Sequence, residues 1–240
     1  MLSGHQWNPL EGFGCTHCFW NINTETLIST SVILLFIIII SVASSYALKK
    51  ENSIGSFAII SYVRLFQAML LETMNVAPLN YLSFIASLFT FIALCNTISI
   101  IPWFEEPTKD INTTLALGLI SFTYVQVISI SVGGWVKYLK EFLHPFFLML
   151  PLNIIGKFTS IISLSFRLFG NIFGGYVILL LYNQMLSGSV FLQTVGLISG
   201  INFALMFIFS IFEGLMQAFV FAMLTMTYLS LEISEEAGNE

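Results

Sequence analysis

The sequence predicts an all-α, polytopic membrane protein with about five membrane-embedded helices and one amphipathic helix at the membrane surface. Hydrophobic residues make up 57% of the 240 positions and charged residues only 9%, whereas a soluble globular domain has about 25% charged residues. Apolar runs recur along the chain, and no proline follows Pro151. We therefore expect one membrane domain over residues 1–240 in contact with the lipid bilayer. The net charge of −5 favours no nucleic-acid partner.

The first apolar run covers residues 27–48 and follows an outer N-terminal segment over residues 1–26. A helix of this length crosses a hydrocarbon core of about 30 Å. The run ends at Lys49 and Lys50, and no positively charged region precedes it. A cleaved signal has the opposite order, so we interpret residues 27–48 as a permanent span.

The next segment, residues 53–76, is more polar than a typical span. Its polar side chains recur at near-helical spacing and are Arg64, Gln67 and Glu72. This pattern predicts an amphipathic helix near the inner surface. Residues 81–101 and 111–136 are then expected to form a pair of helices that cross the membrane in opposite directions.

The basic residues support one orientation of these helices. In the predicted topology Lys109 lies outside and Arg167 lies within the membrane. The remaining basic residues fall on the inner side, and they are Lys49, Lys50, Arg64, Lys137, Lys140 and Lys157. An excess of basic residues inside is typical of membrane proteins.

Residues 152–187 and 190–231 are expected to form a hairpin that turns near Gly188, followed by an inner tail over residues 232–240. The two helices would be about 50 and 60 Å long, far more than the bilayer thickness. Because no proline interrupts them, we expect a tilt of at least about 50° rather than a break.

Arg167 is the candidate functional centre, because a guanidinium within the membrane cannot lose its proton and must be paired or hydrated. The alternative is a structural arginine that binds carbonyl groups and Asn171. Gly170, Gly174 and Gly175 follow within two turns. Small residues at such spacing allow a partner backbone to come close to the charge, although they also serve ordinary helix packing.

The second hairpin helix carries Glu213 and Gln217 four residues apart, with Ser210 three residues before Glu213. A continuous α-helix would place these side chains on one face. Counting from the turn at Gly188 leaves open whether Gln217 lies opposite Arg167.

These motifs resemble subunit a of the F-type ATP synthases, the stator subunit of the proton channel. The matching segments are Ser-Phe-Arg-Leu-Phe-Gly-Asn at 165–171, Gln-Ala-Phe-Val-Phe-Ala-Met-Leu-Thr at 217–225, Phe-Trp-Asn-Ile-Asn at 19–23, Ile-Ile-Pro at 100–102 and Asp-Ile-Asn-Thr-Thr-Leu at 110–115. The resemblance implies a non-catalytic subunit that presents Arg167 to a ring of c subunits. It also implies peripheral-stalk b subunits as partners, protons as the transported ion, and no cofactor.

The resemblance further implies two aqueous half-channels. The outer one would be lined by Asp110, Asn171, Glu213 and Gln217, and Gly170, Gly174 and Gly175 would pack against the ring. Tyr176 and Asn153 stand where many relatives have glutamate, so we infer that Glu213 supplies the missing carboxyl. Candidates for the inner half-channel are Asn153, Ser160, Ser163 and the cluster of Glu232, Glu235 and Glu236, although a solvated helix end is the favoured interpretation of that cluster.

Two other function classes are weighed against this one. A secondary transporter would show repeats and broken helices, and a structural scaffold would need no buried arginine. Cys15 and Cys18 form a single Cys-x-x-Cys, for which a disulfide or free thiols are at least as plausible as zinc, so we predict no metal site. A bacterial inner membrane is the favoured location, with the mitochondrial inner membrane as the alternative.

Overall fold

The structure is a computed structural model that describes residues 6–7, 22–49, 54–74, 79–101, 104, 106–135, 138, 150–188, 194 and 200–237. Its α-helices are α1 (Thr24–Lys49), α2 (Ile54–Met74), α3 (Leu79–Thr97), α4 (Ile111–Gly133), α6 (Leu150–Ser187), α8 (Ile201–Met206) and α9 (Glu213–Ala237). Shorter elements are the 3₁₀ turns η3 (Ile98–Ile100) and η4 (Pro107–Lys109) and the π-helical segment η6 (Phe207–Phe212). Two-residue strands β1 (Gln6–Trp7) and β2 (Ile22–Asn23) pair antiparallel.

Six helical stretches of the described chain are long and apolar enough to cross a membrane, which confirms the all-α, polytopic fold. They are Thr24–Lys49, Ile54–Met74, Leu79–Ile100, Ile111–Gly133, Leu150–Ser187 and Phe203–Ile233. The second stretch is α2, so length and composition do not separate this helix from the spans. Its expected place at the membrane surface stays a prediction.

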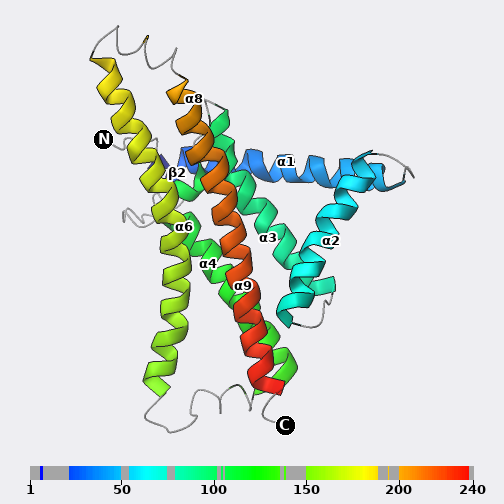
Figure 1. The fold of residues 1–240 in the computed structure, drawn as a ribbon. Coiled ribbons are helices and arrows are strands. Elements are labelled where there is room, and N and C mark those ends of the chain that lie inside the picture. The colour runs from blue at the N-terminus through cyan, green and yellow to red at the C-terminus, as the bar shows by residue number, and fades with distance from the viewer. Residues whose placement is uncertain are drawn as a thin grey trace.

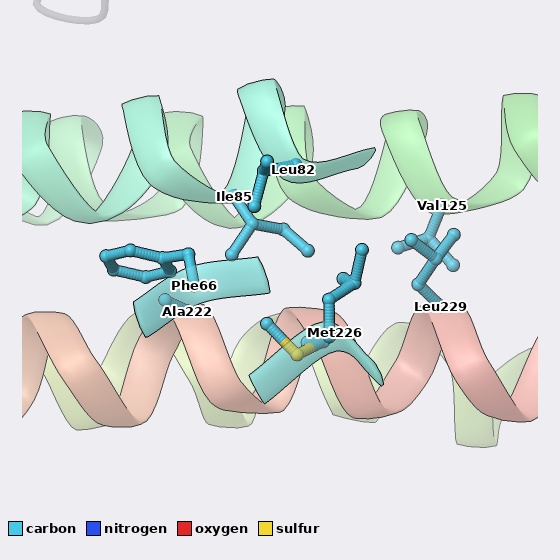
Figure 2. Packing of buried hydrophobic residues seen from close by; sticks show 8 residues of the cluster. Phe66, Leu82, Ile85, Val125, Ala222, Met226 and Leu229 are labelled. Carbon is cyan, nitrogen blue, oxygen red and sulfur yellow. The ribbon is translucent and has the colours of Figure 1, made fainter. Parts of the chain in front are cut away.

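Four helices, α3, α4, α6 and α9, form the centre of the molecule (Figure 1). Helix α9 packs along both α3 and α4, and α6 packs mainly along α4. One core cluster joins α2, α3, α4 and α9, and Figure 2 shows its side chains meeting between the helices. They are Phe66, Leu70, Leu82, Ile85, Val125, Ala222, Met226 and Leu229. Close van der Waals packing of this kind stabilises helices within lipid.

Two glycines allow the closest helix contacts. An ideal Cβ on Gly118 of α4 would lie 2.2 Å from Oγ of Ser165 on α6, and one on Gly214 of α9 would lie 2.8 Å from Cβ of Asn96 on α3. At Gly214 the atom in the way is a Cβ, so the α3 and α9 backbones cross more closely than a larger residue would permit, whereas at Gly118 it is a side-chain hydroxyl. These two crossings fix α6 and α9 against the α3–α4 pair.

The hairpin differs from the sequence prediction in its second helix. The first helix, α6, is continuous over 38 residues. The second was expected to run without a break from residue 190, but Gly200 has a left-handed φ of 70°, which a continuous α-helix excludes, and α8 begins directly after it at Ile201. It then passes through the π-helical segment η6 and extends to Ala237, beyond the predicted end at residue 231.

The relative directions of the helices bear on the predicted tilt. In the view of Figure 1, α1 runs across the direction of α6 and α9. At 1.5 Å per residue, α6 is about 57 Å long, which is nearly twice the hydrocarbon thickness. A steep tilt in the bilayer therefore stays our prediction for both helices of the hairpin.

Candidate functional site

Arg167 lies on the outward face of α6. Residues on the opposite face of this helix, including Leu164, Ser165 and Leu168, are buried against the other helices, whereas Arg167 is exposed. This division follows from helical periodicity, because the apolar stripe faces the bundle. Within the part of the chain that the structure describes, the Arg167 guanidinium has no hydrogen-bond or ion-pair partner.

Small residues precede and follow Arg167 along this outward face. Ser163 is exposed one turn before it, and Gly170 and Gly174 follow one and two turns after it. An added Cβ on either glycine would meet no atom within 4 Å, so the surface beside the guanidinium is low and open. Gly175 faces the other way: its Cβ would lie 3.1 Å from the Phe209 ring, so it belongs to the contact between α6 and η6.

A hydrogen bond joins the hairpin helices next to Arg167. The Asn171 side-chain amide donates to Oε1 of Gln217 at 2.7 Å. Gln217 is buried, whereas Asn171 stands one turn after Arg167 and is exposed. Counting from Gly188 left open whether Gln217 lies opposite Arg167. In the structure Gln217 contacts the turn of α6 that follows the arginine.

Glu213 is the first residue of α9 and is half-buried. Ser210 lies in η6 and is buried, as is Gln217. The predicted common face for all three side chains assumed α-helical spacing throughout, which the π-helical segment interrupts. Glu213 and Gln217 remain one α-helical turn apart, but Ser210 belongs to a different helical geometry.

A buried network that the sequence did not reveal holds the start of α9. The Asn96 side chain is fully buried; it donates to the Gly214 carbonyl oxygen at 3.0 Å and accepts from the Thr108 hydroxyl at 2.7 Å. Both polar ends of the amide are thus satisfied, as burial requires. The contact positions the backbone beside Glu213.

The segment between α3 and α4, predicted to be an outer loop, contributes two further contacts. Asp110 caps α4, because its Oδ1 accepts from the Asn112 backbone amide at 3.0 Å. The Lys109 ammonium lies 3.2 Å from the centre of the Tyr176 ring, a cation–π contact between the loop and α6. No signal in the sequence linked Lys109 with Tyr176, which are far apart along the chain.

At the end of the bundle predicted to lie inside, Lys157 of α6 and Glu232 of α9 form an ion pair at 3.0 Å. Glu232 is only 14% exposed, so the interpretation of this residue as a solvated helix end was wrong. Its partner lies on another helix, which local sequence could not show. Asn153 is half-buried, and the side chains of Glu235 and Glu236 lie outside the described residues. So do Cys15 and Cys18.

Comparison with known proteins identifies the family. Residues 26–230 match the family described as ATP synthase A chain. The chain is 39% identical over 152 residues to ATP synthase subunit a 2 of Acaryochloris marina, which covers 62% of this chain and 59% of that protein. It is 39% identical over 154 residues to ATP synthase subunit a 1 of Chlorobaculum parvum, which covers 64% and 62%.

The matched region thus spans about three fifths of the length of these two relatives. A longer match joins the chain to ATP synthase subunit a of Bacillus velezensis, with 32% identity over 245 aligned positions that cover 97% of this chain and 99% of that protein. Both the family match and this relative extend over most of the sequence. The chain therefore belongs to the ATP synthase A chain family.

Proposed function

We propose that this chain is the non-catalytic stator subunit of the membrane sector of an F-type ATP synthase, and that Arg167 couples ion flow to rotation of a ring of c subunits. The transported ion is the proton. Family membership supports the membrane-sector role. The observation that carries the coupling role is the exposed, unpartnered guanidinium on the outward face of α6, within the described residues.

Arg167 needs a counter-charge to offset the cost of placing it in the membrane. Placing an arginine at the centre of a membrane helix costs about 2.5–3.5 kcal/mol on insertion scales. No carboxylate in the described chain offsets that cost. A carboxyl on a neighbouring subunit would do so, and the open surface at Gly170 and Gly174 lets another helix approach. A guanidinium favours the ionised form of such a carboxyl, so each passing c subunit releases its proton there.

The outer half-channel would pass along Asp110, Asn171, Glu213 and Gln217. The bond between Asn171 and Gln217 supports this grouping, because it places two of these side chains together one turn from Arg167. Glu213 lies one turn from Gln217 and supplies a carboxyl that can accept and release a proton. The arginine would separate this path from the inner one. Protons would then cross the membrane only while bound to the carboxyls of the rotating ring.

The complex would also contain the peripheral-stalk b subunits, and it would lie in an energy-transducing membrane. The relatives named above come from bacteria, which favours the bacterial inner membrane over the mitochondrial one. A secondary transporter remains the alternative function. Copurification of a c-type ring with this chain distinguishes the two.

The coupling role is tested in membrane vesicles that contain the assembled complex. Arg167→Ala should abolish ATP-driven proton pumping while assembly is retained. Arg167→Lys should fail as well, because an ammonium is compact, more strongly hydrated and able to lose its proton. Arg64→Ala is the matched control, since Arg64 is an exposed arginine on α2 rather than on either hairpin helix. Normal pumping by either Arg167 variant would refute the role.

A further inference from the structure

The short turn η4 lies between α3 and α4 and contacts both helices of the hairpin. Pro107 and Thr108 are buried, although the turn is only three residues long. Two backbone hydrogen bonds from residue i+3 to residue i close it, and Pro107 holds its own φ angle at about −65°. The turn is therefore a rigid, packed element rather than an open loop.

Thr108 connects this turn to the start of α9. Its side chain is fully buried, and its hydroxyl donates to Oδ1 of Asn96 at 2.7 Å. The Asn96 amide nitrogen in turn donates to the Gly214 carbonyl oxygen at 3.0 Å. A carbonyl oxygen only accepts, so Asn96 must turn its nitrogen toward Gly214, and its oxygen then needs the Thr108 hydroxyl as a donor. Two hydrogen bonds thus link the turn to the residue that follows Glu213.

Lys109, the next residue of the turn, contacts α6. Its ammonium lies 3.2 Å from the centre of the Tyr176 ring. Tyr176 follows Asn171 by five residues. On α9, Gly214 precedes Gln217 by three. Neighbouring residues of one rigid turn therefore hold both helices close to the hydrogen bond between Asn171 and Gln217, on the side that leads to the connection between the helices.

The backbone that Thr108 holds lies where the second hairpin helix changes its geometry. The π-helical segment η6 ends at Phe212, and α9 begins at Glu213. A π-helix bonds residue i to i+5, whereas an α-helix bonds i to i+4. A junction displaced by one residue would therefore turn the neighbouring side chains toward another face. The contact of Asn96 with Gly214 holds the backbone directly after this junction, which keeps the Glu213 carboxyl in one direction.

We propose that Thr108 and Lys109 are positioning residues of the outer ion path. Through Asn96 and the Tyr176 ring, the turn η4 sets the distance between α6 and α9 and the direction of the Glu213 carboxyl. Neither positioning residue carries a proton in this role. The inference rests on the proposed coupling function and deepens it by assigning residues outside the hairpin that set the geometry of the path.

The test measures ATP-driven pumping per assembled complex, so that a loss of assembly is not counted as a loss of function. Thr108→Val removes the hydroxyl and keeps the shape of the side chain, whereas Thr108→Ser keeps the hydroxyl. Thr114→Val is the matched control. Thr114 is also fully buried, but its hydroxyl donates to the Ile111 carbonyl oxygen of its own helix.

Thr108→Val should lower pumping per complex about tenfold or more, because a displacement of about 1 Å in a reacting group can cost about 100-fold in rate. Thr108→Ser and Thr114→Val should pump at close to the wild-type rate. A double-mutant cycle with Glu213→Gln locates the effect, since two losses that act through one carboxyl are less than multiplicative. Fully multiplicative losses, or equal pumping by Thr108→Val and Thr114→Val, would overturn the positioning role.

The contact of Lys109 is tested on its partner, which leaves the charge of the turn unchanged. Tyr176→Leu should lower pumping per complex, whereas Tyr176→Phe keeps the ring and should not. This pair decides the question if Thr108→Val fails to assemble, because equal pumping by both Tyr176 variants would overturn the role of the turn. Arg167→Ala is measured in parallel. If it pumps normally, the coupling function fails; if it is inactive while Thr108→Val and Tyr176→Leu pump normally, only the positioning role fails.

Discussion

The contact between Gly214 and Asn96 gives a prediction whose magnitude follows from the structure. In Gly214→Ala, the new Cβ would lie 2.8 Å from Cβ of Asn96, whereas ordinary contact begins at 3.4 Å. The α3 and α9 backbones must therefore separate by about 0.6 Å. Both clashing atoms are attached directly to the backbone, so no side-chain rotation relieves the overlap.

The same separation weakens the bond that holds the start of α9. The Asn96 amide donates to the Gly214 carbonyl oxygen at 3.0 Å, so a displacement of that size brings it to the limit of a hydrogen bond. Overpacking of this kind costs about 1–3 kcal/mol. We expect Gly214→Ala to destabilise the subunit by that amount and to slow pumping, because Glu213 and Gln217 move with the backbone.

The assay measures the temperature at which half of this subunit has dissociated from the detergent-solubilised complex. ATP-driven pumping is measured in parallel. Gly156→Ala is the matched control, since its Cβ would meet no atom within 4 Å; alanine there should be neutral or stabilising by up to about 1 kcal/mol. Asn96→Ala should not rescue Gly214→Ala, because it retains the clashing Cβ. Equal stability of the two glycine variants would refute the steric argument.

Two further predictions concern the outer path. Glu213→Gln should slow proton flux severely in assembled complexes, because an amide keeps the size of the carboxyl but exchanges no proton at neutral pH; unchanged flux would end its role as a relay. Tyr176→Leu should lose the contact with Lys109, worth about 0.5–2 kcal/mol, and lower the thermal stability of the subunit, whereas Tyr176→Phe keeps the ring and should behave as wild type. Equal loss in both Tyr176 variants would assign the effect to the hydroxyl instead.

The helices could be predicted from the sequence because the length of an apolar run is a local property. The runs that begin near residues 24, 79, 111 and 150 each appear in the structure as helices long enough to span a membrane. The functional importance of Arg167 could be predicted in the same way, since an arginine in an apolar run is costly wherever the helix packs. The segment at 54–74 was harder to assign because polar side chains in an apolar run fit either a surface helix or a span.

Features set by contacts between distant segments could not be predicted in this way. Nothing in Phe-Ile-Phe-Ser-Ile-Phe at 207–212 marks it as π-helical, and the contact of Asn96 with Gly214 depends on how α3 meets α9. The register of Gln217 was ambiguous because it depended on a tight turn at Gly188. What settles the register is the hydrogen bond between Asn171 and Gln217, a contact between segments far apart in the sequence.

Helix α6 carries two basic side chains whose different chemistry fits their different surroundings. Lys157 is held in a fixed contact with Glu232 of the same chain, where a compact ammonium serves as well as any cation. Arg167 faces outward with no partner in the described residues. A group whose partner arrives and departs must keep its charge in the interval, and a guanidinium does so because it does not lose its proton in proteins. The helix thus places its permanent charge where the counter-charge must come from outside the chain.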